Sequence, residues 1–154
     1  MKRIFILTLF FIFSLAKFNI AYSISPDVFI QSTVNRASQV LSENISKEEK
    51  INKLKIIAKE TVDIRGVGFY SLGSARKNLN DDQKNTYSNL FENYFLKSFS
   101  SRLAEYTNPE IEVKNKQVLN TNYTIVNSIL IATSDRPEVK IDWRVYTKNP
   151  DNPL

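Results

Sequence analysis

Residues 103–116, LAEYTNPEIEVKNK, contain the point at which the periodicity of the chain changes. Before it, apolar residues up to Tyr106 recur at steps of three and four, which is typical of one face of a helix. After Pro109 they alternate with charged residues, beginning with Ile111 and Val113, which is typical of a strand. Helices that precede all the strands favour an α+β fold, with the helices packed on one face of a curved antiparallel sheet.

Capping residues predict three helices before this point. The first begins at Ser25, which a proline follows, and the second begins at Ser46, where Glu49 completes a capping box. The third and longest begins at Asn80, with Gln83 three residues on. We expect an Asn-Pro pair at 108–109 to end it.

An aromatic stripe runs along the third helix. Most stripes of this kind face a core, so a core role is the simpler interpretation. Its members recur at helical spacing: Tyr87, Leu90, Phe91, Tyr94, Phe95, Phe99, Leu103 and Tyr106.

Three strands are predicted at residues 110–119, 122–134 and 138–147, and they form an antiparallel meander with one apolar face. In the middle strand we expect one face to carry Tyr123, Ile125, Asn127, Ile129 and Ile131. The other face then carries Thr124, Val126, Ser128, Leu130 and Ala132.

All three glycines of the chain lie in residues 62–73, VDIRGVGFYSLG, where the second helix is expected to end. Residues 68–75, GFYSLGSA, resemble a phosphate-binding loop, but Ser74 and Ala75 replace the lysine and hydroxyl residue that such a loop requires. Two interpretations remain open. The glycines form a flexible joint, or they allow close helix packing with a helix end at Gly73.

Residues 1–23 are predicted to be a secretory signal peptide. Lys2 and Arg3 precede an apolar run of 12 residues, which is too short to span a membrane, and Ala21 and Ser23 fit a cleavage site. Residues 24–154 then form a single exported domain. Removing the leader lowers the formal net charge from +5 to +2, and no basic cluster indicates nucleic-acid binding.

The chain contains no cysteine and no histidine. This composition excludes disulfides, thiol nucleophiles, Ser-His-Asp triads and histidine metal sites. No pair of acidic residues has a context typical of acid/base catalysis. We therefore expect no catalytic residues, no metal, no cofactor and no enzymatic activity.

Three segments resemble the MlaC family of periplasmic phospholipid-binding proteins, which are auxiliary components of ABC transporters. They are residues 25–41, residues 62–103 and residues 139–154. The middle segment carries most of the matching positions: Val62, Asp63, Leu72, Gly73, Gln83, Tyr87, Phe91, Phe99 and Leu103. The resemblance implies that an Asp-led short helix reaches the Leu-Gly pair.

The resemblance further implies a carrier that moves phospholipid between an outer-membrane lipoprotein complex and an inner-membrane ABC transporter, and so maintains lipid asymmetry. Acyl chains would lie in a dry cavity between the helices and the sheet. The candidate lining residues are Val67, Phe69, Tyr70, Tyr87, Phe91, Phe95, Phe99, Ile111, Val113, Tyr123, Ile125, Ile129, Ile131, Val139, Ile141, Trp143 and Val145.

Two alternatives remain. An exported module of α+β type that binds a small non-lipid ligand or a peptide would share the cavity, and a secreted enzyme that uses carboxylates is the third candidate. Members of the family continue with a further strand and a closing helix. We therefore expect this chain to be incomplete at its C-terminus, with an unpaired outer edge on strand 138–147.

Overall fold

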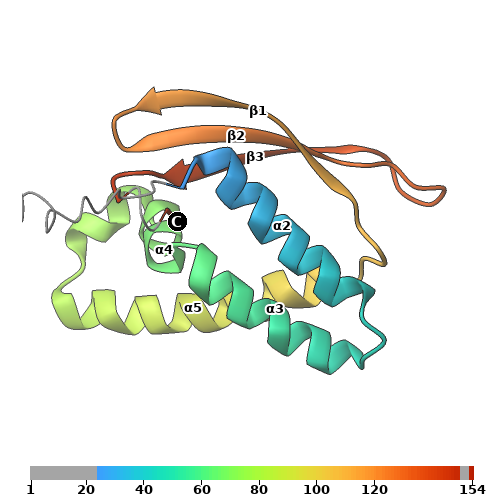
Figure 1. Cartoon of the computed structure of the whole chain (residues 1–154). Helices are drawn as coiled ribbons and strands as arrows, with labels where there is room; N and C mark the ends of the chain where they lie inside the picture. The colour runs from blue at the N-terminus through green and yellow to red at the C-terminus, as the bar shows by residue number, and fades with distance from the viewer. Residues whose placement is uncertain (1–23, 150–152) are drawn as a thin grey trace, which may run out of the picture.

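The computed structural model describes residues 24–149 and 153–154, and the predicted signal peptide lies outside them. The elements follow the predicted order of helices before strands (Figure 1). The helical part comprises α2 (Pro26–Ser42), α3 (Lys47–Thr61), α4 (Ile64–Ser71), the 3-10 helix η1 (Gly73–Asn78) and α5 (Asp81–Leu103). The strands are β1 (Ile111–Asn120), β2 (Tyr123–Leu130) and β3 (Val139–Tyr146). The α+β prediction is confirmed. In the described part of the chain, no helix is both long and apolar enough to span a membrane.

The three predicted helix starts are confirmed, and Ser46 and Asn80 each form a complete capping box. The second helix ends earlier than expected, because Val62 is extended and Asp63 starts a separate helix, α4. The Asp63 carboxylate caps α4 by accepting a hydrogen bond of 2.9 Å from the backbone N–H of Gly66. The glycine segment is therefore largely helical itself.

Two other boundaries depend on local backbone conformation. Helix α5 ends at Leu103, so Tyr106 lies in the turn that follows, where its N–H bonds to the Leu103 carbonyl. Gly73 has a φ of +55°, in the left-handed region that only glycine adopts without strain, and it allows the chain to turn from α4 into η1.

The sheet is an antiparallel meander in the order β1-β2-β3, as predicted. Its register decides which residues face the helices. Val126 lies opposite Trp143 and Ser128 lies opposite Ile141, and residues directly opposite each other share a face. The buried residues of β2 are Thr124, Val126 and Ser128, so the even-numbered residues face the helices.

The helices cover one face of the sheet, and among the described helices only α2 makes extensive contact with it. Helix α2 lies directly against β1 and β2, α3 packs beside α2, and α5 packs against α3 and α4 (Figure 1). Three separate clusters of buried residues result. The first joins α2 to the sheet and includes Val34 and Val126, and the second joins α2 to α3 and includes Leu41 and Leu54. The third joins α3, α4 and α5 around Ala58.

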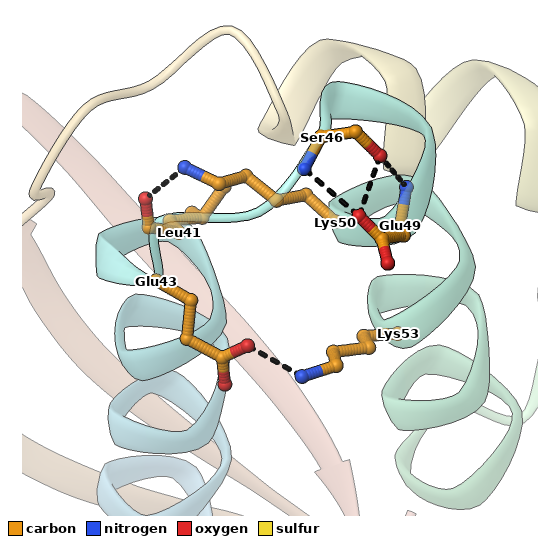
Figure 2. A network of polar contacts seen from close by, with 6 residues as sticks. All are labelled: Leu41, Glu43, Ser46, Glu49, Lys50 and Lys53. Carbon is orange, nitrogen blue, oxygen red and sulfur yellow. Dashed lines mark hydrogen bonds and ion pairs between the residues drawn. The ribbon is translucent and has the colours of Figure 1, made fainter.

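Polar contacts at the corner between α2 and α3 hold these two helices together (Figure 2). The ammonium group of Lys50 donates a hydrogen bond of 2.7 Å to the Leu41 carbonyl, which the end of α2 leaves free. Lys53 forms an ion pair with Glu43. Hydrogen bonds from the side chain and the backbone N–H of Ser46 lower the pKa of Glu49. The corner fixes the relative position of two helices that line the cavity described below.

The outer edge of β3 is not wholly free, contrary to the expectation from the sequence. Tyr146 exchanges two backbone hydrogen bonds with Leu154, of 2.7 and 3.3 Å. The C-terminus consequently lies beside the end of β3 and close to α4 (Figure 1).

Candidate functional site

An apolar cavity of about 300 Å³, here called the inner cavity, lies between the helices and the sheet. Among the described residues, no charged side chain lines it. Its walls come from α2, α3, α5 and all three strands: Thr33, Val34, Ala37, Ser38, Leu41, Leu54, Ile57, Ala58, Thr61, Val62, Phe99, Leu103, Tyr106, Pro109, Ile111, Leu130, Val139, Ile141 and Trp143.

The inner cavity lies where the three hydrophobic clusters meet. Val34 of the first cluster, Leu41 of the second and Ala58 of the third all contribute to its wall. Protein interiors are normally packed with few voids larger than a water molecule. A cavity bounded by all three clusters therefore means that the centre of this domain is hollow.

A second cavity of about 620 Å³, here called the outer cavity, adjoins the first, since Thr61, Val62 and Trp143 line both. It lies between α4 and the end of the sheet formed by the last residues of β3. Its other lining residues are Phe29, Ile30, Asp63, Gly66, Val67, Phe69, Tyr70, Arg76, Tyr123, Arg144, Val145, Tyr146 and Leu154. Unlike the inner cavity, it includes charged side chains.

Trp143 separates the two cavities and has its polar atom satisfied. The indole N–H donates a hydrogen bond of 2.7 Å to the hydroxyl of Ser128, the neighbouring residue on β2. The ring is thereby held in place without leaving an unpaired donor in an apolar site. Trp143 also packs against the cluster that joins α2 to the sheet.

A family model for the MlaC protein matches residues 31–153, which is most of the chain. The chain belongs to the MlaC family. A search of curated proteins gave no match. Among solved structures, the chain is similar to the phospholipid-binding protein from Ralstonia solanacearum, which was determined in complex with a phospholipid. The TM-score is 0.68 at 13% identity, over 84% of this chain and 74% of that chain. At this identity the likeness shows a common fold.

Ten of the residues predicted from the MlaC resemblance line one of the two cavities. The inner cavity is lined by Phe99, Ile111, Val139, Ile141 and Trp143. The outer cavity is lined by Val67, Phe69, Tyr70, Tyr123 and Val145, and again by Trp143. Val113 lines neither of these cavities and packs against the cluster that joins α2 to the sheet.

Three predicted aromatic residues, Tyr87, Phe91 and Phe95, line neither cavity. They form a column with Phe69 and Phe99, with ring centroids 5.1–6.3 Å apart. The column packs α5 against α3 and α4. It connects the outer cavity at Phe69 to the inner cavity at Phe99. Two other members of the predicted stripe, Leu90 and Tyr94, are exposed.

Three predicted lining residues of the middle strand, Ile125, Ile129 and Ile131, line neither of the two cavities. Ile125 and Ile129 alternate with the buried residues of β2 and therefore lie on the face of the sheet away from the helices. Ile131 follows the end of β2 and lines neither cavity. Both faces of this strand carry branched apolar residues, so the alternation alone did not reveal which one is buried.

Sequence reasoning missed the walls that α2 and α3 contribute to this MlaC-family cavity. The missed residues include Ala37, Leu41, Leu54, Ile57 and Ala58. The signal was present as the apolar spacing of both helices, but such spacing identifies a buried face without showing whether a cavity lies beside it.

The arrangement suits the binding of an apolar or amphipathic molecule. Within residues 24–149 and 153–154, no cluster of acidic side chains is suitable for holding a metal ion. Burying apolar ligand surface in the inner cavity would contribute about 25 cal/mol per Å². Volumes of this size are typical of sites that enclose small molecules and cofactors.

Proposed function

We propose that this protein is a phospholipid carrier of the periplasm. The observation that carries the proposal is the hollow centre of the domain, where an uncharged inner cavity meets a larger and more polar outer cavity. Acyl chains would occupy the inner cavity and the headgroup would lie towards the outer cavity. Membership of the MlaC family supports the proposal, as does the phospholipid held by the structural neighbour from Ralstonia solanacearum.

The carrier exchanges lipid with membrane complexes in this proposal. The predicted signal peptide would direct it to the periplasm, where an inner-membrane ABC transporter complex and an outer-membrane lipoprotein complex would be its partners. Binding and release need no catalytic group, so the proposed carrier requires no enzymatic activity. N-terminal sequencing of the protein from the periplasmic fraction tests the compartment: a chain that starts near Ile24 is expected, and an intact Met1 chain in the membrane fraction contradicts it.

A vesicle transfer assay tests the carrier activity. Donor vesicles carry a phospholipid with a fluorescent acyl chain, and acceptor vesicles carry none. We expect catalytic amounts of the purified protein to accelerate transfer, and mass spectrometry of the protein afterwards to show bound phospholipid. An unchanged transfer rate, or a peptide or other non-lipid molecule as the bound ligand, would contradict the proposal.

Two matched substitutions connect the assay to the cavity. Ala37 is half-buried and lines the inner cavity, whereas Ala75 is exposed on η1 and lines neither cavity. Ala37→Phe should abolish transfer with little loss of stability, because the new ring fills existing space. In a close-packed core the same change would cost about 1–3 kcal/mol. Ala75→Phe should transfer lipid as the wild type does.

A further inference from the structure

The two cavities follow one another along β3. Val145 lines the outer cavity and Trp143 lines both cavities. Nearer the start of the strand, Ile141 and Val139 line the inner cavity. A strand rises about 3.3 Å per residue, so the inner cavity extends about 13 Å along β3, from Trp143 to Val139. One end of it therefore meets the outer cavity, and the other, here called the distal end, lies at the start of β3.

The segment that joins α5 to β1 forms part of the distal end. Tyr106 and Pro109 of this segment line the inner cavity. Leu130, which lies directly opposite Val139 in the sheet, lines it from β2. Tyr106 is partly buried and packs against the cluster that joins α2 to α3. Its ring is the largest side chain at this end, so its position limits how far an apolar ligand can reach.

An exposed arginine from the connection between β2 and β3 holds this ring. The guanidinium carbon of Arg136 lies 4.3 Å from the centroid of the Tyr106 ring, and a guanidinium N–H donates a hydrogen bond of 3.2 Å to the Glu105 carbonyl. The Arg136 carbonyl accepts a hydrogen bond of 2.9 Å from the N–H of Thr133, which closes the turn between the strands. Arg136 lines neither cavity, so the Tyr106 ring lies between the inner cavity and an exposed cation.

We propose that Tyr106, held in place by Arg136, limits the length of the acyl chains that the protein accepts. A methylene group is similar in size to a water molecule, which takes up about 30 Å³, so the inner cavity of about 300 Å³ has room for about ten methylene groups. Two ordinary acyl chains contain more. Each further methylene group must either stay in the outer cavity or displace the ring from Arg136. This inference rests on the proposed lipid-binding function and adds to it a preference among phospholipids.

The test is a competition between two phospholipids that differ only in chain length. Dimyristoleoyl and dioleoyl phosphatidylglycerol have the same headgroup and the same unsaturation, and the second has the longer chains. The purified protein is incubated with vesicles that contain equal amounts of both until exchange is complete, and its bound lipids are then quantified by mass spectrometry. Because every protein meets the same vesicles, a difference between proteins in the ratio of bound species reports on the protein alone.

Two substitutions change the distal end in different ways. Tyr106→Leu shortens the side chain and keeps it apolar. The ratio of long-chain to short-chain lipid should rise at least about fivefold, since closed apolar pockets discriminate a single methylene by about tenfold or more. Arg136→Gln removes the contact that holds the ring and leaves the ring itself, so the ratio should rise about twofold, as expected for an exposed cation–π contact.

Arg65→Gln is the matched control. Arg65 is also an exposed arginine that stacks on an aromatic ring, 5.3 Å from the centroid of Phe69, but it lines neither cavity and lies far from the distal end in the sequence. Its variant should carry the two lipids in the wild-type ratio. Urea denaturation measures the stability of each protein. Because Arg136 is exposed, its variant keeps the test decisive if Tyr106→Leu proves unstable.

Two outcomes would overturn the inference. A ratio that is the same in the wild type, Tyr106→Leu and Arg136→Gln would show that the ring does not limit chain length. A rise in Arg65→Gln as large as that in Arg136→Gln would show that the effect does not come from the distal end. If the wild type takes up neither lipid, the proposed function itself fails, and this result differs from an unchanged ratio in a protein that is loaded with phospholipid.

Discussion

Gly68 shows how one missing side chain allows α4 to pack on α5. A Cβ atom at this position would lie 2.8 Å from a ring carbon of Phe91, closer than such contacts allow. The Gly68 carbonyl also accepts hydrogen bonds from the hydroxyl groups of Tyr87 and Ser71, at 3.1 and 2.7 Å. Of the two interpretations open from the sequence, close helix packing accounts for this glycine, and the flexible joint stays untested.

Gly68→Ala should therefore destabilise the protein through Phe91. Overpacking costs about 1–3 kcal/mol, and the better helix propensity of alanine offsets up to about 1 kcal/mol of it. In a Phe91→Leu background the same change should cost at least about 1 kcal/mol less. Urea denaturation of the four proteins measures this coupling, and an equal effect in both backgrounds would show that the contact with Phe91 is unimportant.

Ser100 is a buried residue whose side-chain hydroxyl has no hydrogen-bond partner among the described residues. Its side chain lies fully buried in α5. Ser100→Ala should increase the free energy of unfolding by about 1 kcal/mol, because an unpaired buried hydroxyl is costly. Ser98→Ala, where the hydroxyl bonds to the Tyr94 carbonyl, is the control. A lower denaturation midpoint for Ser100→Ala than for the wild type would refute this explanation.

At the scale of elements, an ion pair connects the start of α2 to β1. The ammonium group of Lys116 lies 2.6 Å from the Asp27 carboxylate, which also accepts a hydrogen bond from Ser25. The hydrogen bond from Lys116, followed by that from Ser25, lowers the pKa of Asp27 from 3.8 to about 2. The folded state therefore favours the ionised carboxylate.

This shift gives a pH-dependent prediction for Lys116→Met. A lowered pKa in the folded state stabilises the protein above pH 3.8, and this contribution is lost as the pH falls from 3.8 towards 2. Because both side chains are partly exposed, the free energy of unfolding at pH 6 should be higher for the wild type than for the variant by less than about 1 kcal/mol. The difference should vanish only below about pH 2, where the carboxyl group is protonated in both the folded and the unfolded state.

NMR titration of the Asp27 carboxyl measures the same effect directly. Its pKa should rise towards the ordinary range in Lys116→Met and stay low in the control Lys114→Met. Lys114 pairs with Glu112 on its own strand, so it makes no connection between elements. An Asp27 pKa that is the same in the wild type and in Lys116→Met would contradict the assignment to Lys116.

The elements also show how far sequence alone could reach. Caps such as Ser46 and Asn80 act within a few residues, so the helix starts were predictable. The inward face of β2 depends on a partner far along the chain, because Val126 is buried through its position opposite Trp143. Ile125 is equally apolar and lies on the outer face. Periodicity detects a strand but does not distinguish two apolar faces.

At the scale of the whole molecule, the main feature is that three hydrophobic clusters surround a space instead of merging into one core. The sequence indicated apolar helices and an apolar sheet face, and the resemblance to the MlaC family implied a cavity between them. The sequence could not identify which residues form the walls of the cavity, because a residue that lines a cavity and a residue that fills a core have the same periodicity. Leu41 and Phe91 illustrate this difference: the first lines the inner cavity and the second packs between helices.

The central claim is that the space between the clusters holds the acyl chains. The most direct measurement is photocrosslinking with a phospholipid that carries a diazirine at the end of one acyl chain, followed by mapping of the modified residues by mass spectrometry. We expect labelling of inner-cavity residues from both layers, such as Leu41, Ile57 and Ile141. Labelling confined to the outer face of the sheet at Ile125 and Ile129, or to the exposed Leu90 of α5, would contradict the account.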